Sequence, residues 1–445
     1  MSGGHNAVVR PSADRQATAP PALRGRLRAS LGPERARALR HVLALFATFQ
    51  VTVWTIAAIA SLKLPPHPPL NDPDLLTRPL GPLGNAIVAP LARYDAAWYL
   101  GVAAHGYGPA HEGLTRFMGF FPLYPLLVRA VAATVTYPFG TRVSYVLAGS
   151  LVSAAALVPA LYLLHRLAEL DLGPRLARAT VALTLAFPTA FFFAAPYTES
   201  LFLLLSVGAI YAARLGRWPL AGLAAALASA TRPGGVLVLV PLVMLYLWGP
   251  RSDRPPRPRA SPAARPLPAH RPSWDVLWLG LAPAGALAFF AFLRARYGHF
   301  DAYLTVQRRW WHHHVAGPGS AVARLADDAR TAFGQIRDGA PVAATRAPID
   351  AMLRPAFVIL GLLGVVGIAR RIQPAYAAYA LVSLALPLLS PPSIGVARYL
   401  VVVFPLFMWL AVVADRRGVL QYVLAFSVAL LALFTATFAT WRGVA

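Results

Sequence analysis

Long apolar runs separated by short polar segments recur from about residue 41 to the end of the chain. Several of these runs hold about 17 to 23 mostly apolar residues, which is enough for a helix to cross a hydrocarbon core of roughly 30 Å. Between the runs the chain turns to arginine, proline and other polar residues. This pattern predicts an all-α, polytopic membrane protein.

The apolar runs predict about eleven transmembrane helices, within a range of about 10 to 13, because some runs are short and their ends are ill defined. The predicted spans cover residues 41–62, 143–165, 179–195, 199–213, 218–231, 235–248, 274–293, 354–369, 374–390, 399–414 and 418–440.

The segment Phe120–Tyr137 is apolar but carries Pro122, Pro125 and Arg129, and we interpret it as re-entrant or interfacial. Eight arginines precede the first span and place its start in the cytoplasm, since basic residues are retained on that side. With 120–137 peripheral, the arginine-rich connections fall inside, the N-terminus is cytoplasmic and the C-terminus external.

Composition agrees with a membrane protein, because 57% of residues are hydrophobic and only 13% are charged. The formal net charge is +24, yet the basic residues lie in short connections and not on one continuous face, which argues against nucleic-acid binding. Lys63 is the single lysine, and this arginine bias suggests a GC-rich, bacterial source. The absence of cysteine excludes disulfides, thiolate metal sites and cysteine nucleophiles.

The chain divides into a basic tail and one membrane domain. Residues 1–40 are predicted to be a disordered cytoplasmic tail, and residues 41–445 to be a single transmembrane domain. The longer connections within this domain are predicted to be a first external loop at 63–142, a cytoplasmic Arg/Pro linker at 250–272 and a second external loop at 294–353.

An acidic residue set among aromatics stands out in the first external loop, in the segment Arg93–Tyr107. The spacing over Asn85–Ala104 predicts an amphipathic helix lying in the membrane interface. Asp95 has two readings that the sequence leaves open. It can cap the helix that begins at Ala96, or it can serve as a general base toward a hydroxyl.

Two arginines lie at the predicted outer ends of helices. Arg232 and Arg398 can extend toward lipid headgroups, but a guanidinium also suits a clamp on a phosphate, and we favour that role for both. For Arg129 and Arg354 we favour membrane anchoring. Glu199 is expected in an external turn at a helix N-terminus, or facing a polar cavity.

The run His312–His314 does not predict a metal site, because three consecutive histidines cannot all face one ion without strain and no acidic ligand adjoins them. Trp310 and Trp311 suit an interfacial aromatic belt, with stacking on sugar or lipid as the alternative. No nucleotide-binding or hydrolase motif occurs in a supporting context. Nucleotide sugars are made in the cytoplasm, so a sugar donor used outside the cell would be lipid-linked.

Several motifs together resemble the PIG-V type of GPI mannosyltransferase and its bacterial homologues. These are YDAAWYLGVAAHGY at 94–107, FFPLYP at 120–125, PYTESLF at 196–202, SATRPGG at 229–235, VQRRWW at 306–311 and ARYLVVVFPLF at 397–407. The resemblance runs in order from about residue 93 to 405. It implies a GT-C-like glycosyltransferase fold that takes a sugar from a polyprenyl phosphate at the external leaflet.

The resemblance also implies roles for individual residues. Asp95 corresponds to the catalytic aspartate of the family, and Arg232 and Arg398 to phosphate contacts. The full set of substrate-binding candidates is Arg93, Tyr94, Trp98, His105, Tyr107, Glu112, Tyr197, Glu199, Arg232, Gln307, Trp310, Arg398 and Tyr399. Ala96 stands where some GT-C relatives carry a second acid, and Glu112 is the nearest acidic residue downstream.

The expected activity is transfer of a sugar, mannose above all, from a polyprenyl-phosphate donor to a lipid-linked or cell-envelope glycan, with inversion. No cofactor is expected, and a divalent cation is compatible but not required. The alternatives are a lipid or glycan transporter and a non-catalytic subunit that binds polyprenyl phosphate. The expected location is a bacterial cell membrane, with the active site on the external face.

Overall fold

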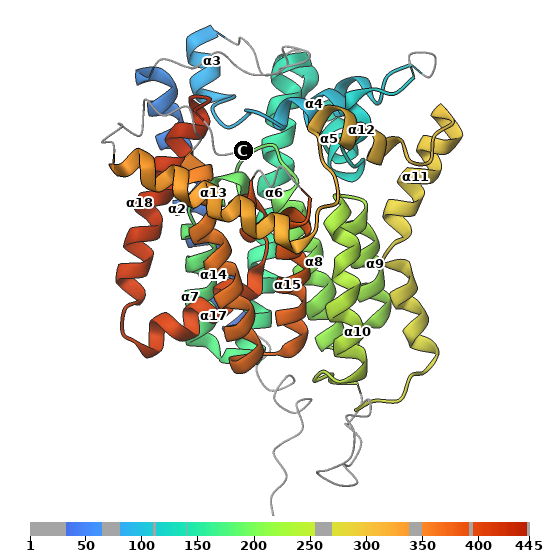
Figure 1. Ribbon diagram of the computed structural model, residues 1–445, viewed down its shortest axis with the longest axis vertical. Helices are drawn as coiled ribbons and strands as arrows, with labels where there is room; N and C mark the ends of the chain where they lie inside the picture. Colours follow the sequence, from blue (N-terminus) through green and yellow to red (C-terminus); the bar gives the residue numbers. More distant parts are fainter. Residues whose placement is uncertain are drawn as a thin grey trace, which may run out of the picture.

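The computed structural model describes residues 33–64, 81–109, 113–139, 141–253, 269–337, 349–390 and 395–442. Within these ranges the regular elements are helices and no strand occurs. Long helices run side by side along the vertical axis of Figure 1 and form one bundle. The all-α architecture predicted from the sequence is confirmed.

Each of the eleven predicted spans contains helix. The elements concerned are α2 (Pro33–Lys63), α6 (Thr141–Leu172), α7 (Pro174–Ala186), α8 (Glu199–Arg214), α9 (Trp218–Ser229), α10 (Leu239–Leu247), α11 (Ala284–Tyr297), α14 (Ile349–Arg371), α15 (Pro374–Leu388), α17 (Phe404–Arg416) and α18 (Leu420–Ala439). Short 3₁₀ segments extend this set at η3 (Ala190–Phe193), η4 (Pro233–Val238) and η5 (Trp274–Leu281).

Within the described ranges, four helices are long and apolar enough to cross a membrane unaided: Glu34–Lys63, Tyr145–Leu172, Leu353–Arg371 and Leu420–Ala439. The pair η5 and α11, bent by 47°, makes a fifth if it forms one broken span. Other helices are shorter. The 16 residues of α8 extend only about 24 Å at 1.5 Å per residue. The number of spans therefore stays a prediction.

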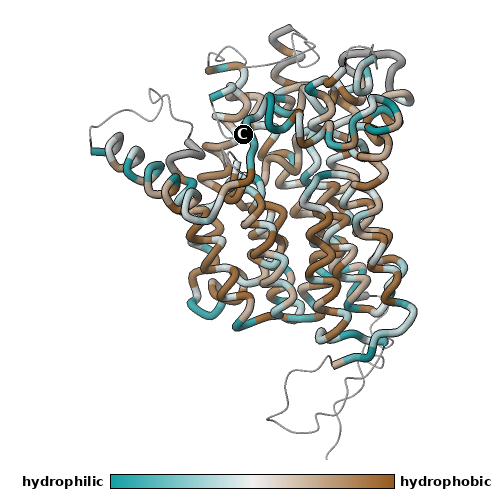
Figure 2. The backbone as a smooth tube through the Cα atoms, turned by 45° about the vertical axis from the view of Figure 1, so that its right-hand side comes forward, coloured by the Kyte–Doolittle hydropathy of each residue, from teal (hydrophilic) through white to brown (hydrophobic). Residues whose placement is uncertain are grey.

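Hydropathy changes along the length of the helix bundle. Hydrophobic segments fill the middle of the helices and hydrophilic ones gather toward the two ends (Figure 2). Large apolar side chains are exposed on the outside of the bundle, among them Val51 of α2, Leu363 of α14 and Phe426 of α18. Exposed apolar side chains on long apolar helices are expected where lipid is the solvent, which supports an integral membrane protein.

Short elements collect at one end of the bundle, the upper end in Figure 1. They include α3 (Gly81–Ile87), α4 (Ala96–His105), α5 (Leu123–Phe139) and α12 (Ala302–Trp311), which Figure 1 labels there. The remaining elements are the short η2 (Arg116–Gly119) and α16 (Val396–Leu400) and the longer α13 (Pro318–Arg337). Figure 1 draws α13 across the front of the long helices.

The predicted interfacial helix over Asn85–Ala104 is wrong in two respects. The structure has two helices here, α3 and α4, separated by a loop that contains Pro90. Residues 96–103 of α4 are all buried. A helix that carries small or apolar residues on every side, as Ala96–Ala103 does, is stable when it is surrounded by protein. The loop that holds Asp95 is therefore attached to a core helix.

The segment after η2 forms α5, which stays at the same end of the bundle as α4 (Figure 1). Arg129 of α5 donates from Nε to the carbonyl of Ala103 at 2.6 Å and from Nη2 to that of Ala104 at 3.0 Å. These carbonyls belong to the last turn of α4, whose backbone acceptors have no helical partner. Arg129, predicted to anchor the chain to the membrane, caps α4.

A close approach between α6 and the turn before α8 fixes that turn. A Cβ atom at Gly149 would lie 2.6 Å from the Cβ atom of Pro196, so only glycine fits there. The hydroxyl of Tyr124 donates to the Gly149 carbonyl at 2.8 Å, and Ser153 donates to the Ala195 carbonyl at 2.7 Å. The start of α8 is thus held on the α6 backbone.

Candidate active site

Asp95 lies at the N-terminal end of α4 but its side chain makes no capping hydrogen bond. Instead, its Oδ2 accepts a hydrogen bond from Nη1 of Arg398 at 2.6 Å. The side chain of Asp95 is 34% exposed. Of the two readings that the sequence left open, the structure therefore excludes the side-chain cap and leaves an accessible carboxylate paired with an arginine.

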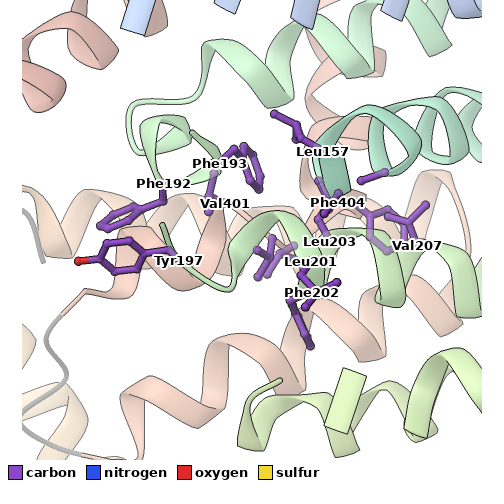
Figure 3. Packing of buried hydrophobic residues seen from close by; sticks show 14 of the residues in the cluster. Leu157, Phe192, Phe193, Tyr197, Leu201, Phe202, Leu203, Val207, Val401 and Phe404 are labelled. Carbon is purple, nitrogen blue, oxygen red and sulfur yellow. The ribbon is translucent and has the colours of Figure 1, made fainter. Parts of the chain in front are cut away.

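Arg398 connects the acidic groups of the site. Its Nε donates to Oε1 of Glu199 at 2.6 Å, and its Nη2 lies 3.5 Å from the hydroxyl of Tyr99. The guanidinium carbon lies 4.6 Å from the ring centroid of Tyr197 and 5.2 Å from that of Phe192, which are side by side in Figure 3. Stacking on aromatic faces favours the charged guanidinium and fixes its plane.

Glu199, the first residue of α8, is completely buried and holds two arginines with one oxygen. Its Oε1 accepts from Arg398 and also from Nη2 of Arg232 at 2.6 Å. Nη2 of Arg232 donates to the Thr198 hydroxyl as well. Glu199 thus lies at a helix N-terminus, as predicted, and its carboxylate contacts a polar cluster.

The four charged groups balance, with two carboxylates against two guanidinium groups. The Arg398 side chain is 14% exposed and that of Arg232 is 11% exposed. Burial disfavours the charged form of Arg398, but the nearby charges of Glu199 and Asp95 outweigh it and hold its pKa well above its ordinary value. Burial raises the pKa of Tyr99, which keeps that hydroxyl neutral. Arg398 therefore stays charged while the adjacent phenol stays protonated.

Arg93 and Tyr94 hold the loop in front of Asp95. The Nε of Arg93 donates to the carbonyl of Ala439, at the end of α18, at 3.0 Å, and Tyr197 donates to the Arg93 carbonyl at 2.7 Å. Tyr94 has a φ of 51°, which is uncommon for a residue other than glycine. Its ring centroid lies 4.9 Å from that of Trp441. Both residues were predicted to bind substrate, and the structure gives each a part in placing Asp95.

Aromatic side chains from three segments pack beside α4. The ring of Trp98 stacks on Phe120 with 5.9 Å between centroids, and Trp311 meets Trp98 edge-on at 5.7 Å. The hydroxyl of Tyr107 donates to the Phe120 carbonyl at 2.9 Å. Gln307 of α12 donates to the Gly119 carbonyl at 3.0 Å. The predicted candidates Trp98, Tyr107 and Gln307 therefore join α4, η2 and α12.

The other predicted candidates lie at the edge of this group or outside the described residues. Tyr399 follows Arg398 in α16 and is partly buried. Trp310 is partly buried and its ring centroid lies 5.0 Å from the guanidinium carbon of Arg309. His105 is an exposed residue at the end of α4. Glu112 lies outside the described residues.

In the part of the chain that the structure describes, no group of three or more histidine, cysteine or acidic side chains could hold a metal ion. In the His312–His314 run, Nδ1 of His313 lies 3.2 Å from the carbonyl oxygen of Ser390, and Nδ1 of His314 lies 3.0 Å from that of His312. These two contacts are to backbone oxygens.

Sequence reasoning missed three residues of the charged cluster's immediate surroundings. Tyr99, Phe192 and Thr198 all contact its arginines. Thr198 and Phe192 lie within or just before the PYTES turn, so their proximity to Glu199 was a usable signal. Nothing in the sequence indicated that Arg398, 199 positions away from Glu199, would lie over Phe192.

Comparison with known proteins gives matches to one mannosyltransferase family. The family model described as mannosyltransferase (PIG-V) matches residues 39–247. The GPI alpha-1,6-mannosyltransferase 2 of Rattus norvegicus is 30% identical over 213 residues, which are 44% of this chain and 41% of that protein. The Mus musculus protein of the same name is 30% identical over 215 residues, with 45% and 41% covered. The matched region thus spans about two fifths of these relatives.

Among solved structures, the oligosaccharyltransferase of Archaeoglobus fulgidus is similar at 16% identity and a TM-score of 0.42, with 89% of this chain and 55% of that chain covered. That score is too low to support an argument about a shared fold.

The helical membrane architecture, the accessible carboxylate beside a paired arginine cluster and the match to a sugar-transferase family model together make the chain similar to membrane glycosyltransferases. Within that class the chain is similar to the PIG-V mannosyltransferases, whose family model matches residues 39–247, somewhat less than half of the chain, and to the two rodent relatives. The predicted resemblance is confirmed.

Proposed function

We propose that this protein transfers mannose from a polyprenyl-phosphate donor to a lipid-linked or cell-envelope glycan, on the external face of the membrane and with inversion at the sugar. The observation that carries the proposal is the pairing of Asp95 with Arg398, which in turn is shared with the buried Glu199. A base for the acceptor and a cation for the departing phosphate are thereby adjacent.

The different surroundings of the two carboxylates assign them different roles. Asp95 is 34% exposed and accepts one hydrogen bond from Arg398, so an acceptor hydroxyl can approach it. Glu199 is fully buried between two arginines and cannot meet a substrate hydroxyl. A general base must lie within hydrogen-bond reach of the proton it takes. Asp95 is therefore the base in this proposal.

The reaction requires one bond to form and one to break at the sugar. Asp95 takes the proton of the acceptor hydroxyl, whose oxygen attacks C1 of the mannose from the face opposite the phosphate. The C1–O bond to phosphate breaks, and its electron pair leaves with the polyprenyl phosphate. Attack opposite the leaving group inverts the configuration at C1. Arginine side chains stabilise the charge that grows on the leaving phosphate.

Arg232 and Arg398 have N–H groups available to donate hydrogen bonds to a phosphate. Within the described ranges the hydrogen bonds of Arg232 come from Nη2, which leaves Nε and Nη1 for another acceptor. Among the described residues, Nη2 of Arg398 makes only the long contact of 3.5 Å with Tyr99. A guanidinium presents its donors in a fork that matches phosphate oxygens. These donors support the assignment of both arginines to the phosphate.

The test is transfer of a labelled sugar by purified protein. The protein in lipid nanodiscs is incubated with polyprenyl-phosphate [¹⁴C]mannose and a lipid extract of its native membranes, and the labelled product is identified by mass spectrometry. Formation of a new mannosylated lipid or glycan supports the proposal. Absence of product, with a nucleotide-linked sugar accepted in its place, would contradict the donor class.

A further inference from the structure

We propose that Asp95 and the donor phosphate compete for Arg398, so that donor binding releases the carboxylate to act as base. The inference rests on the proposed function and concerns the order of events at the same site. It follows from three features of the cluster: its charge balance, the direction of the Arg398 donors and the incomplete hydrogen bonding of Glu199.

The charge balance favours competition. Two carboxylates already balance the two guanidinium groups: Glu199 lies 2.6 Å from both arginines, and Asp95 lies 2.6 Å from Arg398. A donor phosphate adds at least one negative charge, and like charges at such separations repel strongly at a partly buried site. Because Glu199 is fully buried and bound to both arginines, Asp95 is the acid that can move away.

The N–H groups of Arg398 that donate hydrogen bonds divide into a buried set and an accessible one. Nε points to Glu199, which has no exposed surface, whereas Nη1 points to Asp95, the most exposed member of the cluster. A phosphate that arrives from the accessible side therefore meets the same edge of the guanidinium that Asp95 uses.

Glu199 gives Arg398 a way to compensate for the loss of Asp95. The Oε2 atom of Glu199 is buried and has no hydrogen-bond partner among the described residues. A buried, unpaired carboxylate oxygen is costly. A small rotation that brings Nη2 of Arg398 toward Oε2 would turn a single hydrogen bond into a two-bond fork, which is the favoured arginine–carboxylate geometry.

The consequence is a fixed order of events at the site. While Asp95 is bound to Arg398, its Oδ2 accepts a charge-assisted hydrogen bond from Nη1 and is not free to accept one from a substrate hydroxyl. Once the phosphate takes the accessible edge of Arg398, Asp95 can accept a hydrogen bond from the acceptor hydroxyl. Donor binding before acceptor activation follows from this exchange.

The experiment measures binding without turnover. The affinity of a short-chain polyprenyl monophosphate is determined for wild type, Asp95→Asn and Asp328→Asn in neutral-lipid nanodiscs. Asp328 pairs with Arg354 at 2.7 Å and provides the same chemical change at another arginine pair. Competition predicts that Asp95→Asn binds the lipid phosphate about three- to tenfold more tightly than wild type, since a partly exposed ion pair no longer has to break. Asp328→Asn should bind as wild type does.

An Asp95→Asn affinity equal to or weaker than that of wild type overturns the competition, even if that variant has lost transferase activity and the role of Asp95 as base stands. If wild type does not bind the lipid phosphate at all, both the competition and the proposed donor are overturned.

A second measurement does not depend on the variant folding. In a structure of the wild-type protein bound to the polyprenyl monophosphate, the competition predicts that Asp95 Oδ2 and Arg398 Nη1 are separated beyond about 3.5 Å, outside hydrogen-bond range. Retention of that hydrogen bond alongside the bound phosphate would overturn it.

Discussion

The Oδ2 atom of Asp95 lies 2.6 Å from Nη1 of Arg398, although 303 positions separate the two residues along the chain. Asp95 comes from the start of α4 and Arg398 from the short helix α16. This contact joins the loop region after the first long helix to the last third of the chain. It pairs a carboxylate and a guanidinium group from two distant parts of the chain.

Arg398→Lys should lower kcat/KM about 100-fold, because removing a fixed donor from a developing anion typically costs about 2.7 kcal/mol in the transition state. A lysine ammonium cannot hold Glu199 and Asp95 in the same plane while facing a phosphate. Initial rates of labelled mannose transfer measure the effect. The control is Arg354→Lys, which alters the pair with Asp328 and should stay near wild type. Wild-type kinetics for Arg398→Lys would remove this arginine from the reaction.

Glu199→Gln should destabilise the fold by about 3 kcal/mol, because two largely buried arginines lose the carboxylate they share. Thermal unfolding in detergent, followed by tryptophan fluorescence, measures the change. Glu34→Gln is the matched control, since Glu34 is an exposed residue in the first turn of α2 and should change stability by less than about 0.5 kcal/mol. Equal stability of the two variants would show that Glu199 does not hold the cluster.

Gly149→Ala should reduce activity at least about tenfold and cost about 1 to 3 kcal/mol of stability, because the new methyl group would push Pro196 away from α6. The turn that carries Glu199 would move with it. Gly208→Ala in α8 is the control, since its Cβ would be in ordinary contact at 3.6 Å from Leu163. Activity assays and thermal unfolding of both variants decide the matter. If the two substitutions behave alike, the close approach does not position the turn.

Tyr197→Phe should lower the rate several-fold with a stability loss of about 1 to 2 kcal/mol, since the buried carbonyl of Arg93 loses its donor. The loop that carries Asp95 would be less tightly held. The control is Tyr211→Phe, a partly buried tyrosine of α8. Rate and melting temperature are measured for both. A fully active Tyr197→Phe protein would mean that the hydrogen bond to Arg93 does not place Asp95.

The hydrophobic pattern was sufficient to predict the helical architecture, because each apolar run is a local property of the chain. The short helices at the end of the bundle that holds Asp95 were harder to predict. The spacing over Asn85–Ala104 suggested one surface helix, but burial of α4 depends on α5, α6 and η2, which the local pattern does not contain.

The residues of the site were indicated by motifs, whereas their partners were not. Asp95, Glu199, Arg232 and Arg398 each appeared as a candidate, yet only the fold shows that one oxygen of Glu199 meets both arginines. Arg93 and Arg129 illustrate the reverse case. Arg93 lies just before Asp95 in the chain and Arg129 contacts the far end of α4, but their guanidinium groups bind backbone carbonyls, which depends on where neighbouring helices end.

The most direct test of the central claim is the rate of mannose transfer by Asp95→Asn, measured at saturating donor and acceptor against Asp328→Asn as the control. Asparagine keeps the size of the side chain but cannot take a proton, so the account predicts a kcat at least about 1,000-fold below wild type, in the upper part of the range for loss of a general base. The Asp328→Asn rate should be unchanged. A folded Asp95→Asn protein that transfers mannose at a rate within tenfold of wild type would contradict the assignment of Asp95 as the base.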